Sequence, residues 1–366
     1  MILALKDDLS QDLTATPEAL ADPLSTLLRA DRQGDHLLTL SRKASPFLLD
    51  AVAPLLSLRD RGMLFRVADR EMSHGAWTRH PHLTITATGV PARAHPDLPY
   101  VPWRWFSAQG RGAPTLLVAE MLGNDAEIYP RIANQVPVDG ASVRLEIQGG
   151  GGNQTGANWA ARARERVAIA VVDPDRRAPK TQVKETCRDA REAARRVRAS
   201  WEGDDEADVD GPEAAEDEVV AHLVVLRART IESIIPPDWY IHAGVDIGPH
   251  AGRLPLLAPE CRWVNRKTGV ECRHITRADA EAEYLRGLLA VPESFDCGKH
   301  GDGPPIQPCK EKIVPGLGEK ALERVRDWLV GNPAEAARTI GESPELQRVA
   351  TRLAWWGAAS APTPAP

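Results

Sequence analysis

The sequence predicts an α/β fold in which a parallel β-sheet is flanked by helices. Two runs of aliphatic residues, 116–119 and 167–172, have the length and composition of strands buried on both faces. Glu120 follows the first run, and Asp173 and Asp175 follow the second. The intervening pattern indicates a helix, a second strand and a glycine-rich turn that leads into another helix.

The N-terminal region, residues 1–110, also has an α/β pattern and is expected to form its own domain. Thr16 and Pro17 are typical of the start of a helix, which we expect to extend to Arg32. Further elements are predicted here as strands at 36–41, 63–68 and 83–88 and a helix at 46–59 that is interrupted at Pro54. Trp103 and Trp105 either pack at a domain interface or stack on nucleotide bases.

The central and C-terminal regions continue this alternation. The expected elements are a helix from about 124 to 134, a strand at 142–148, a glycine run at 149–152, a helix at 182–201 and a strand at 221–226. Beyond residue 245 the pattern is mainly helical, and residues 357–366, all small residues and proline, are expected to be disordered. Cys261, Cys272, Cys297 and Cys309, with His274 or His300, give only a weak zinc pattern.

The three carboxylates predict a metal site. Functional residues in open parallel sheets gather just beyond the carboxyl ends of the strands. We therefore expect Glu120, Asp173 and Asp175 at one edge of the sheet, where their mutual repulsion favours a hard divalent cation, Mg²⁺ or Mn²⁺. Taken alone, Asp173-Pro174-Asp175 is also compatible with an ordinary polar turn.

The order of these motifs resembles the Toprim module of topoisomerases, primases, small ribonucleases and overcoming-lysogenisation-defect nucleases. Toprim-like effectors of bacterial antiphage systems tend to have Val-Asp-Ser-Asp-Arg after the third strand and Arg-x-x-Glu-Asn-Tyr-x-Pro further on. The chain has Val172-Asp173-Pro174-Asp175-Arg176 and then Arg229-Thr230-Ile231-Glu232-Ser233-Ile234-Ile235-Pro236. The resemblance covers residues 113–240 and extends more weakly to about 330.

The resemblance implies a Toprim-like Rossmannoid sheet in a catalytic domain, residues 111–245, with residues 246–356 as an extension. It also implies a Mg²⁺-dependent nuclease that cleaves DNA or RNA in antiphage defence. Asp173 and Asp175 would be metal ligands, and Glu120 a ligand or general acid/base. Glu232 would bind a second ion, and Lys299 or Arg176 would stabilise the developing charge.

The chain departs from the family pattern directly after Glu120. The family has glycine next and an aspartate four residues on, whereas here Gly123, Asn124 and Asp125 follow Met121-Leu122. A catalytically degenerate scaffold or sensor subunit is therefore the alternative function. A primase-like nucleotidyl transferase is less favoured because no template-binding module is recognisable. No Walker motif is present, so we expect any ATPase or sensor to be a separate chain, and a homo-oligomer is compatible with the sequence.

Basic residues recur at helical spacing in the 182–201 helix. Arg188, Arg191 and Arg195 would form one face that, with Arg176, follows a phosphate backbone, although a solvated face is an equally good interpretation. Residues 202–218 contain ten acids and no base, and removing these charges from the net charge of −6 leaves +4. This acidic segment is expected to be disordered, and the mildly basic remainder is compatible with nucleic acid.

The composition indicates a cytoplasmic protein. An apolar content of 43% and a charged content of 26% are those of an ordinary globular protein. No long apolar run predicts a membrane span, and the N-terminal residues do not have the pattern of a signal peptide. The five cysteines are odd in number and scattered, which fits a reducing compartment better than a disulfide framework.

Overall fold

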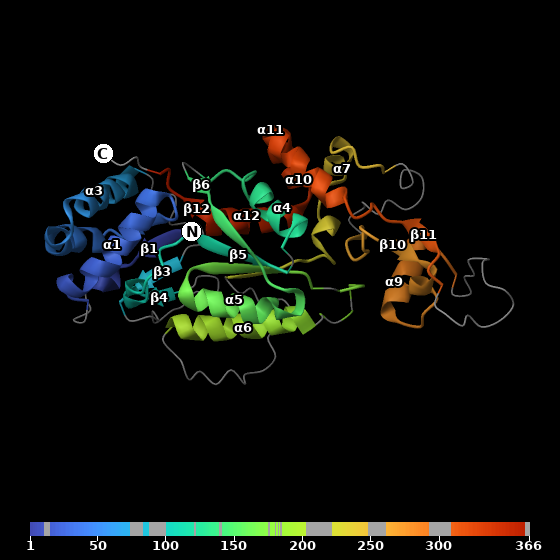
Figure 1. Cartoon of the computed structure of the whole chain (residues 1–366), viewed down its shortest axis with the longest axis horizontal. Helices are drawn as coiled ribbons and strands as arrows, with labels where there is room; N and C mark the ends of the chain where they lie inside the picture. Colours follow the sequence, from blue (N-terminus) through green and yellow to red (C-terminus); the bar gives the residue numbers. More distant parts are fainter. Residues whose placement is uncertain are drawn as a thin grey trace.

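The fold is mixed α/β, as expected, and contains two Rossmann-like parallel sheets (Figure 1). The computed structural model describes residues 1–10, 15–73, 83–87, 100–120, 122–138, 141–174, 176–179, 181, 183, 185–202, 222–247, 261–292 and 309–362. In this part of the chain, no helix is both long enough and apolar enough to cross a membrane.

The first sheet has the strand order β2-β1-β3-β4, and all neighbouring strands are parallel. Its strands are β1 (Ile2–Leu5), β2 (Leu37–Leu40), β3 (Leu83–Thr86) and β4 (Tyr100–Pro102). Strand β1 was not expected, although all four of its residues are buried. Helix α1 (Pro17–Gln33) begins where predicted, because the Thr16 side chain accepts a hydrogen bond from the Ala19 N–H.

The prediction of a strand at residues 63–68 is wrong, because these residues belong to helix α3 (Leu58–Ser73). Met63, Leu64 and Val67 are buried, whereas Phe65 is 49% exposed. That spacing follows the helical period and not the two-residue alternation of a strand. The predicted interruption near Pro54 is present. The 3₁₀ turn Ala53–Leu55 follows the short helix α2 (Ala44–Phe47) and a π-helical turn, and separates them from α3.

The second sheet has the order β7-β5-β8-β9 and is also entirely parallel. Its strands are β5 (Thr115–Ala119), β7 (Leu145–Gly149), β8 (Ala168–Val172) and β9 (Leu223–Val225). Strands β5 and β8 lie at the centre and are buried throughout, as their composition predicts. The chain passes from β5 outward to β7 and then back across to β8. The topological switch point therefore lies between the carboxyl ends of β5 and β8.

Helices cover both faces of the second sheet (Figure 1). Helices α5 (Thr155–Glu165) and α6 (Glu185–Glu202) pack side by side on one face. The other face carries α4 (Asn124–Ala133), α10 (Ala321–Gly331) and α12 (Pro344–Gly357). The short helices α7 (Pro237–His242) and α11 (Pro333–Thr339) lie near α10. One continuous apolar core joins both sheets and these helices, from Met1 to Ala358.

The strand predicted at 142–148 is divided between two sheets. Strand β7 joins the second sheet, whereas β6 (Ser142–Val143) pairs antiparallel with β12 (Ala358–Ala359). Residues 357–366 were expected to be disordered, but Ala358 and Ala359 are fully buried. The Ser360 N–H donates a hydrogen bond of 3.2 Å to the His36 carbonyl. Part of the expected tail is therefore an ordered element that contacts the N-terminal sheet.

A small module lies beyond the carboxyl end of the second sheet, and we call it the β10–β11 module (residues 261–292 and 309–315; Figure 1). It contains the antiparallel strands β10 (Gly269–Glu271) and β11 (Lys312–Pro315) and the helices α8 (Cys272–Ile275) and α9 (Ala280–Leu289). It has a separate apolar core, which includes Cys261, Val270 and Leu285.

Candidate functional site

Glu120 and Asp173 meet at the switch point of the second sheet. Strands β5 and β8 pair in parallel up to Ala119 and Val171, so both acids emerge at the same edge. The backbone N–H of Asp173 donates a hydrogen bond of 3.3 Å to Oε1 of Glu120. Both residues are half-buried, so their carboxylates lie in a partly shielded position at the carboxyl end of the sheet.

The glycine run after β7 closes around Glu120. The N–H groups of Gly150 and Gly152 donate to the carbonyls of Ala119 and Glu120 at 2.6 and 2.9 Å. Gly151 and Gly152 have φ angles of 80° and 61°, a left-handed conformation that favours glycine. Because both amides bond the main chain of the β5 end, this turn positions Glu120 and does not offer those two N–H groups to a phosphate.

Two of the predicted arginines act on the same buried thiol as Glu120. Cys187, in the first turn of α6, is buried, and burial raises the pKa of its thiol to about 11. The positive charges of Arg191 and Arg176 oppose this pKa shift, and the negative charge of Glu120 adds to it. Arg191 also hydrogen-bonds to Cys187. The three charged residues are therefore within electrostatic range of a single thiol.

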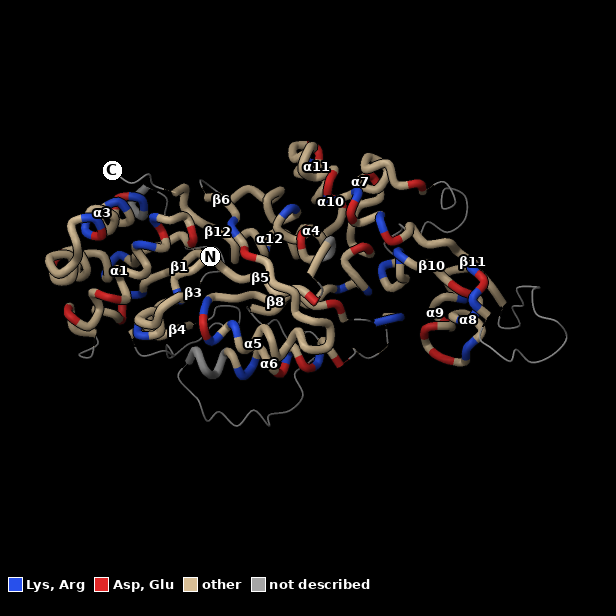
Figure 2. Tube along the Cα trace, in the orientation of Figure 1, with Lys and Arg blue, Asp and Glu red and all other residues tan. Residues whose placement is uncertain are grey.

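The remaining predicted arginines continue along α6, where basic and acidic residues alternate (Figure 2). Arg188 is exposed, and Arg195 is half-buried one turn beyond Arg191. Arg196, on a more exposed face, forms an ion pair with Glu192. The basic face of α6 thus begins at the candidate site and runs away from it.

Glu232 lies apart from the two central acids. It is 7% exposed in the 3₁₀ turn Ile231–Ser233, which follows β9. Its backbone carbonyl accepts hydrogen bonds from the Tyr240 hydroxyl at 2.9 Å and from Arg266 at 3.0 Å. Over the described ranges, no three His, Cys, Asp or Glu residues form a group that could hold a metal ion. Glu232 therefore does not complete such a group with Glu120 and Asp173.

The other predicted site residues either lie outside the described residues or do not form the predicted site. Asp175 and Lys299 lie outside the described residues, as do Cys297, His300 and most of the acidic segment. Cys261 and Cys272 are buried and Cys309 is half-buried, without a zinc-binding group among the described residues. Trp103 and Trp105 are 3% and 8% exposed, which supports packing and not base stacking.

Glu281 is a central residue that the sequence did not predict. It is 4% exposed, at the start of α9, where Asp279 caps the helix by accepting a hydrogen bond from the Ala282 N–H. Its carboxylate forms ion pairs with Arg177 at 3.1 Å and Arg229 at 3.4 Å. Arg177 follows β8 and Arg229 follows β9, so one carboxylate fixes the β10–β11 module to two loops at the carboxyl edge.

Further bonds join the β10–β11 module to the segment after β9. The Arg229 N–H donates to the Arg262 carbonyl at 2.9 Å, and the Ser233 hydroxyl donates to the Val264 carbonyl at 3.1 Å. Arg266, which is 2% exposed, donates to the carbonyls of Glu232 and Ile235. The module is thereby held beside the candidate site.

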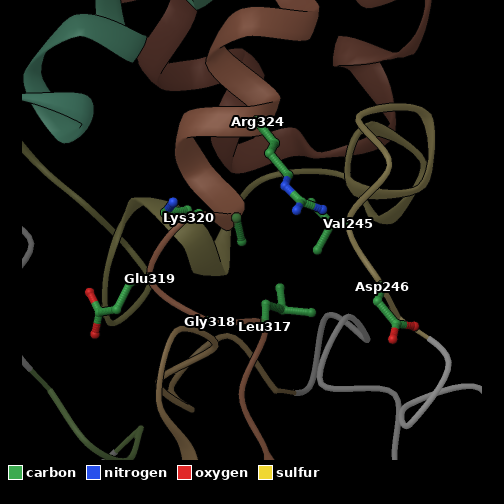
Figure 3. Close-up of a pocket in the computed structure, with 8 residues that line it drawn as sticks. Val245, Asp246, Leu317, Gly318, Glu319, Lys320 and Arg324 are labelled. Atoms are coloured by element: carbon green, nitrogen blue, oxygen red, sulfur yellow. The ribbon is translucent and has the colours of Figure 1, made fainter.

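A hollow of about 330 Å³ lies at the start of α10 (Figure 3). Lys320, Arg324, Asp246 and Glu319 line it, so its charges are mixed. Arg324 donates a hydrogen bond of 2.7 Å to the Gly244 carbonyl, and Glu319 forms an ion pair with Lys267 at 2.5 Å. These bonds tie α10 to the neighbouring loops.

In comparisons with known proteins, no family model, no curated protein and no solved structure matches the chain. The chemistry of the site is therefore judged from its own residues. Mg²⁺ is commonly held by one or two carboxylates, with waters and substrate phosphates completing its shell. Glu120 and Asp173 each supply one carboxylate at the ends of adjacent parallel strands, and carboxylate oxygens are the donor type that Mg²⁺ and Mn²⁺ prefer.

Proposed function

We propose that the chain is a Mg²⁺- or Mn²⁺-dependent nuclease that hydrolyses phosphodiester bonds of DNA or RNA. The observation that carries the proposal is the hydrogen bond from the backbone N–H of Asp173 to the Glu120 carboxylate, which brings the ends of β5 and β8, each followed by an acid, together at the switch point of a parallel sheet. Arg176 and Arg191 support it, because they are within electrostatic range of the same thiol as Glu120 and cationic side chains bind phosphate oxygens.

Each of these residues has a distinct role in the proposed reaction. Glu120 and Asp173, with Asp175, would hold the metal ion, which neutralises charge on the non-bridging phosphate oxygens and orients a water when bound. The Asp173 N–H holds the Glu120 carboxylate through Oε1, and Glu120 would act as a ligand or as the general acid/base that accepts a proton from that water. Arg176 and Arg191 bind the phosphate and oppose the charge that develops on it, and Lys299 is a further candidate for this role.

The setting that we propose is antiphage defence in the cytoplasm, as a Toprim-type effector. The support is the resemblance of the motifs around Asp173 and Glu232 to those effectors. A separate ATPase or sensor chain would then activate the nuclease, and the chain would act as a homo-oligomer or with that partner.

The test is metal-dependent cleavage of a panel of single- and double-stranded DNA and RNA. We expect cleavage with Mg²⁺ or Mn²⁺, no cleavage with EDTA, and loss of cleavage in Asp173→Ala without loss of folding. Asp22→Ala removes an exposed carboxylate of α1 and is the matched control. Unchanged cleavage in Asp173→Ala would overturn the proposal.

A second function, a non-catalytic scaffold or sensor, is favoured by the altered turn after Glu120. The same panel separates the two functions. A scaffold would bind nucleic acid or a partner chain equally well with EDTA and would leave every substrate intact.

A further inference from the structure

A cavity of about 430 Å³ lies between the loop after β8 and helix α9. Ala178 and Pro179 line it from the loop, and Tyr284, Leu288 and Glu283 line it from the helix. The described lining is therefore mainly apolar, with one aromatic ring and one exposed carboxylate.

An ion pair fixes the two walls of this cavity. Arg177 directly precedes Ala178, and Glu281 directly follows Ala280, a further lining residue. Arg177 and Glu281 are 3.1 Å apart, and the Glu281 carboxylate is almost fully buried. The cavity is thus held beside the loop that carries Arg176.

The cavity is also close to the candidate catalytic edge. Ala178 is five residues from Asp173, and five extended residues span at most about 17 Å. Arg176 and Arg177 lie between the two along the chain. A strand whose phosphate is bound at Glu120 and Asp173 therefore has the cavity within the reach of one or a few nucleotides.

We propose that this cavity binds an unpaired nucleobase of the substrate strand, next to the phosphate that is cleaved. The inference rests on the proposed nuclease function and deepens it by naming the substrate class, a single strand or a strand with an unpaired base. A base in a duplex is stacked and paired, so it must be taken out of the helix before it enters such a cavity.

The chemistry of the lining favours a base over other groups. Among the described lining residues, the charged one is Glu283, whose carboxylate disfavours a phosphate. The ring of Tyr284 offers a stacking partner, and such stacking tolerates any base. The Glu283 carboxylate accepts hydrogen bonds and so favours bases that present an amino group, such as cytosine.

The test compares the binding of a labelled single strand and of the matching duplex in EDTA, where no cleavage occurs. Stacking on one aromatic side chain contributes about 1–3 kcal/mol, so we expect Tyr284→Ala to weaken single-strand binding about 5- to 150-fold. Duplex binding should be unchanged, and Tyr284→Phe should bind the single strand as the wild type does. Val330→Ala removes a 58% exposed apolar side chain from α10 and is the control.

Two further measurements exclude a general loss of folding. Glu283→Ala alters an exposed residue and should reduce the preference for oligo(dC) over oligo(dT) without changing the melting temperature. An abasic nucleotide at the bound position should weaken binding by the wild type and leave Tyr284→Ala unaffected. The inference would be overturned if Tyr284→Ala weakened single-strand and duplex binding equally, or weakened neither. The cavity would then be a candidate site for an apolar side chain of another protein.

The failure of this inference can be distinguished from that of the nuclease. Metal-dependent cleavage that requires Asp173 but does not depend on Tyr284 would support the nuclease function and contradict the base-binding site. Single-strand binding that depends on Tyr284, without any cleavage, would support the base-binding site and contradict the nuclease function.

Discussion

The backbone N–H of Asp173 donates its hydrogen bond to Glu120, so the contact does not involve the Asp173 side chain. Replacing the Asp173 side chain leaves this contact in place, and the Glu120 carboxylate keeps its orientation. The two acids can therefore be altered separately, and the loss of one function can be assigned to one carboxylate.

Glu120→Gln should reduce cleavage about 10²- to 10⁴-fold, because the amide cannot accept a proton from the attacking water. The amide oxygen can still accept the Asp173 N–H, so the free energy of unfolding should change by less than about 0.5 kcal/mol. Single-turnover cleavage and urea denaturation measure the two effects. Glu127→Gln, at a mainly exposed residue of α4 that pairs with Arg326, is the control, and equal activity in both variants would contradict the assignment.

Arg191→Gln should weaken nucleic-acid binding and lower the slope of log K against log salt concentration by about 1, as expected for the loss of one phosphate contact. Arg196→Gln is the control on the same helix, because Arg196 is exposed and pairs with Glu192. Fluorescence anisotropy at several salt concentrations gives both slopes. If the two variants had identical slopes, Arg191 would not contact the phosphate backbone.

Glu281→Ala should destabilise the fold by about 2–3 kcal/mol, because it leaves partly buried arginines without their shared carboxylate. The value is at the low end for a buried pair, since the Arg177 side chain is 39% exposed. Glu283→Ala, two residues on and exposed, should change stability by less than about 0.5 kcal/mol. Urea denaturation measures the stability of both variants. Similar losses of stability would show that the ion pairs of Glu281 with Arg177 and Arg229 make no specific contribution.

Gly156→Ala should destabilise by about 1–3 kcal/mol, because α5 and α6 approach closely at this glycine. An added Cβ would lie 2.9 Å from the backbone N and Cα of Ala190. Gly62→Ala is the matched change in α3, where nothing lies within 4 Å of the added Cβ, and it should stabilise by about 0.4–1 kcal/mol. Thermal or urea unfolding distinguishes the two, and the same sign of change in both would contradict the packing argument.

Stability should fall as the pH decreases below the ordinary pKa of histidine, partly through His36. Burial lowers the pKa of His36 well below its usual value of 6.5. The folded form stays neutral while the unfolded form binds a proton, so protonation favours unfolding. Between pH 7.5 and 5.5 this amounts to about 1.4 kcal/mol.

Urea denaturation of the wild type and His36→Gln at these two pH values isolates the contribution of His36. The stability difference between the two proteins should shift by about 1.4 kcal/mol in favour of the variant at the lower pH. A constant difference would mean that His36 takes up a proton as readily in the folded protein as in the unfolded chain.

The central sheet was predictable because its signals are local. The aliphatic runs at β5 and β8 are buried throughout, and the acids that end them meet as the switch-point rule requires. Helix α1 begins where its cap residue predicts. Helix α3 was mistaken for a strand because a six-residue apolar run is too short to distinguish the two periods.

The features that could not be predicted depend on distant parts of the chain. Glu281 meets Arg177 across 104 positions, and no pattern near either residue indicates the pair. The pairing of β6 with β12 and the burial of Ser360 likewise depend on a partner far away in the sequence. Small residues near the C-terminus appeared disordered because their composition reveals nothing about such partners.

The pairing of β12 and the contacts of Ser360 also set an order of events during synthesis. The Ser360 hydroxyl bonds the His36 carbonyl across 324 positions, and Pro362 lies against Gly34 at the end of α1. Chains are made from the N-terminus, and such long-range contacts form only when both partners exist. On the ribosome, the N-terminal sheet therefore remains uncovered at this edge until residues 358–362 have emerged.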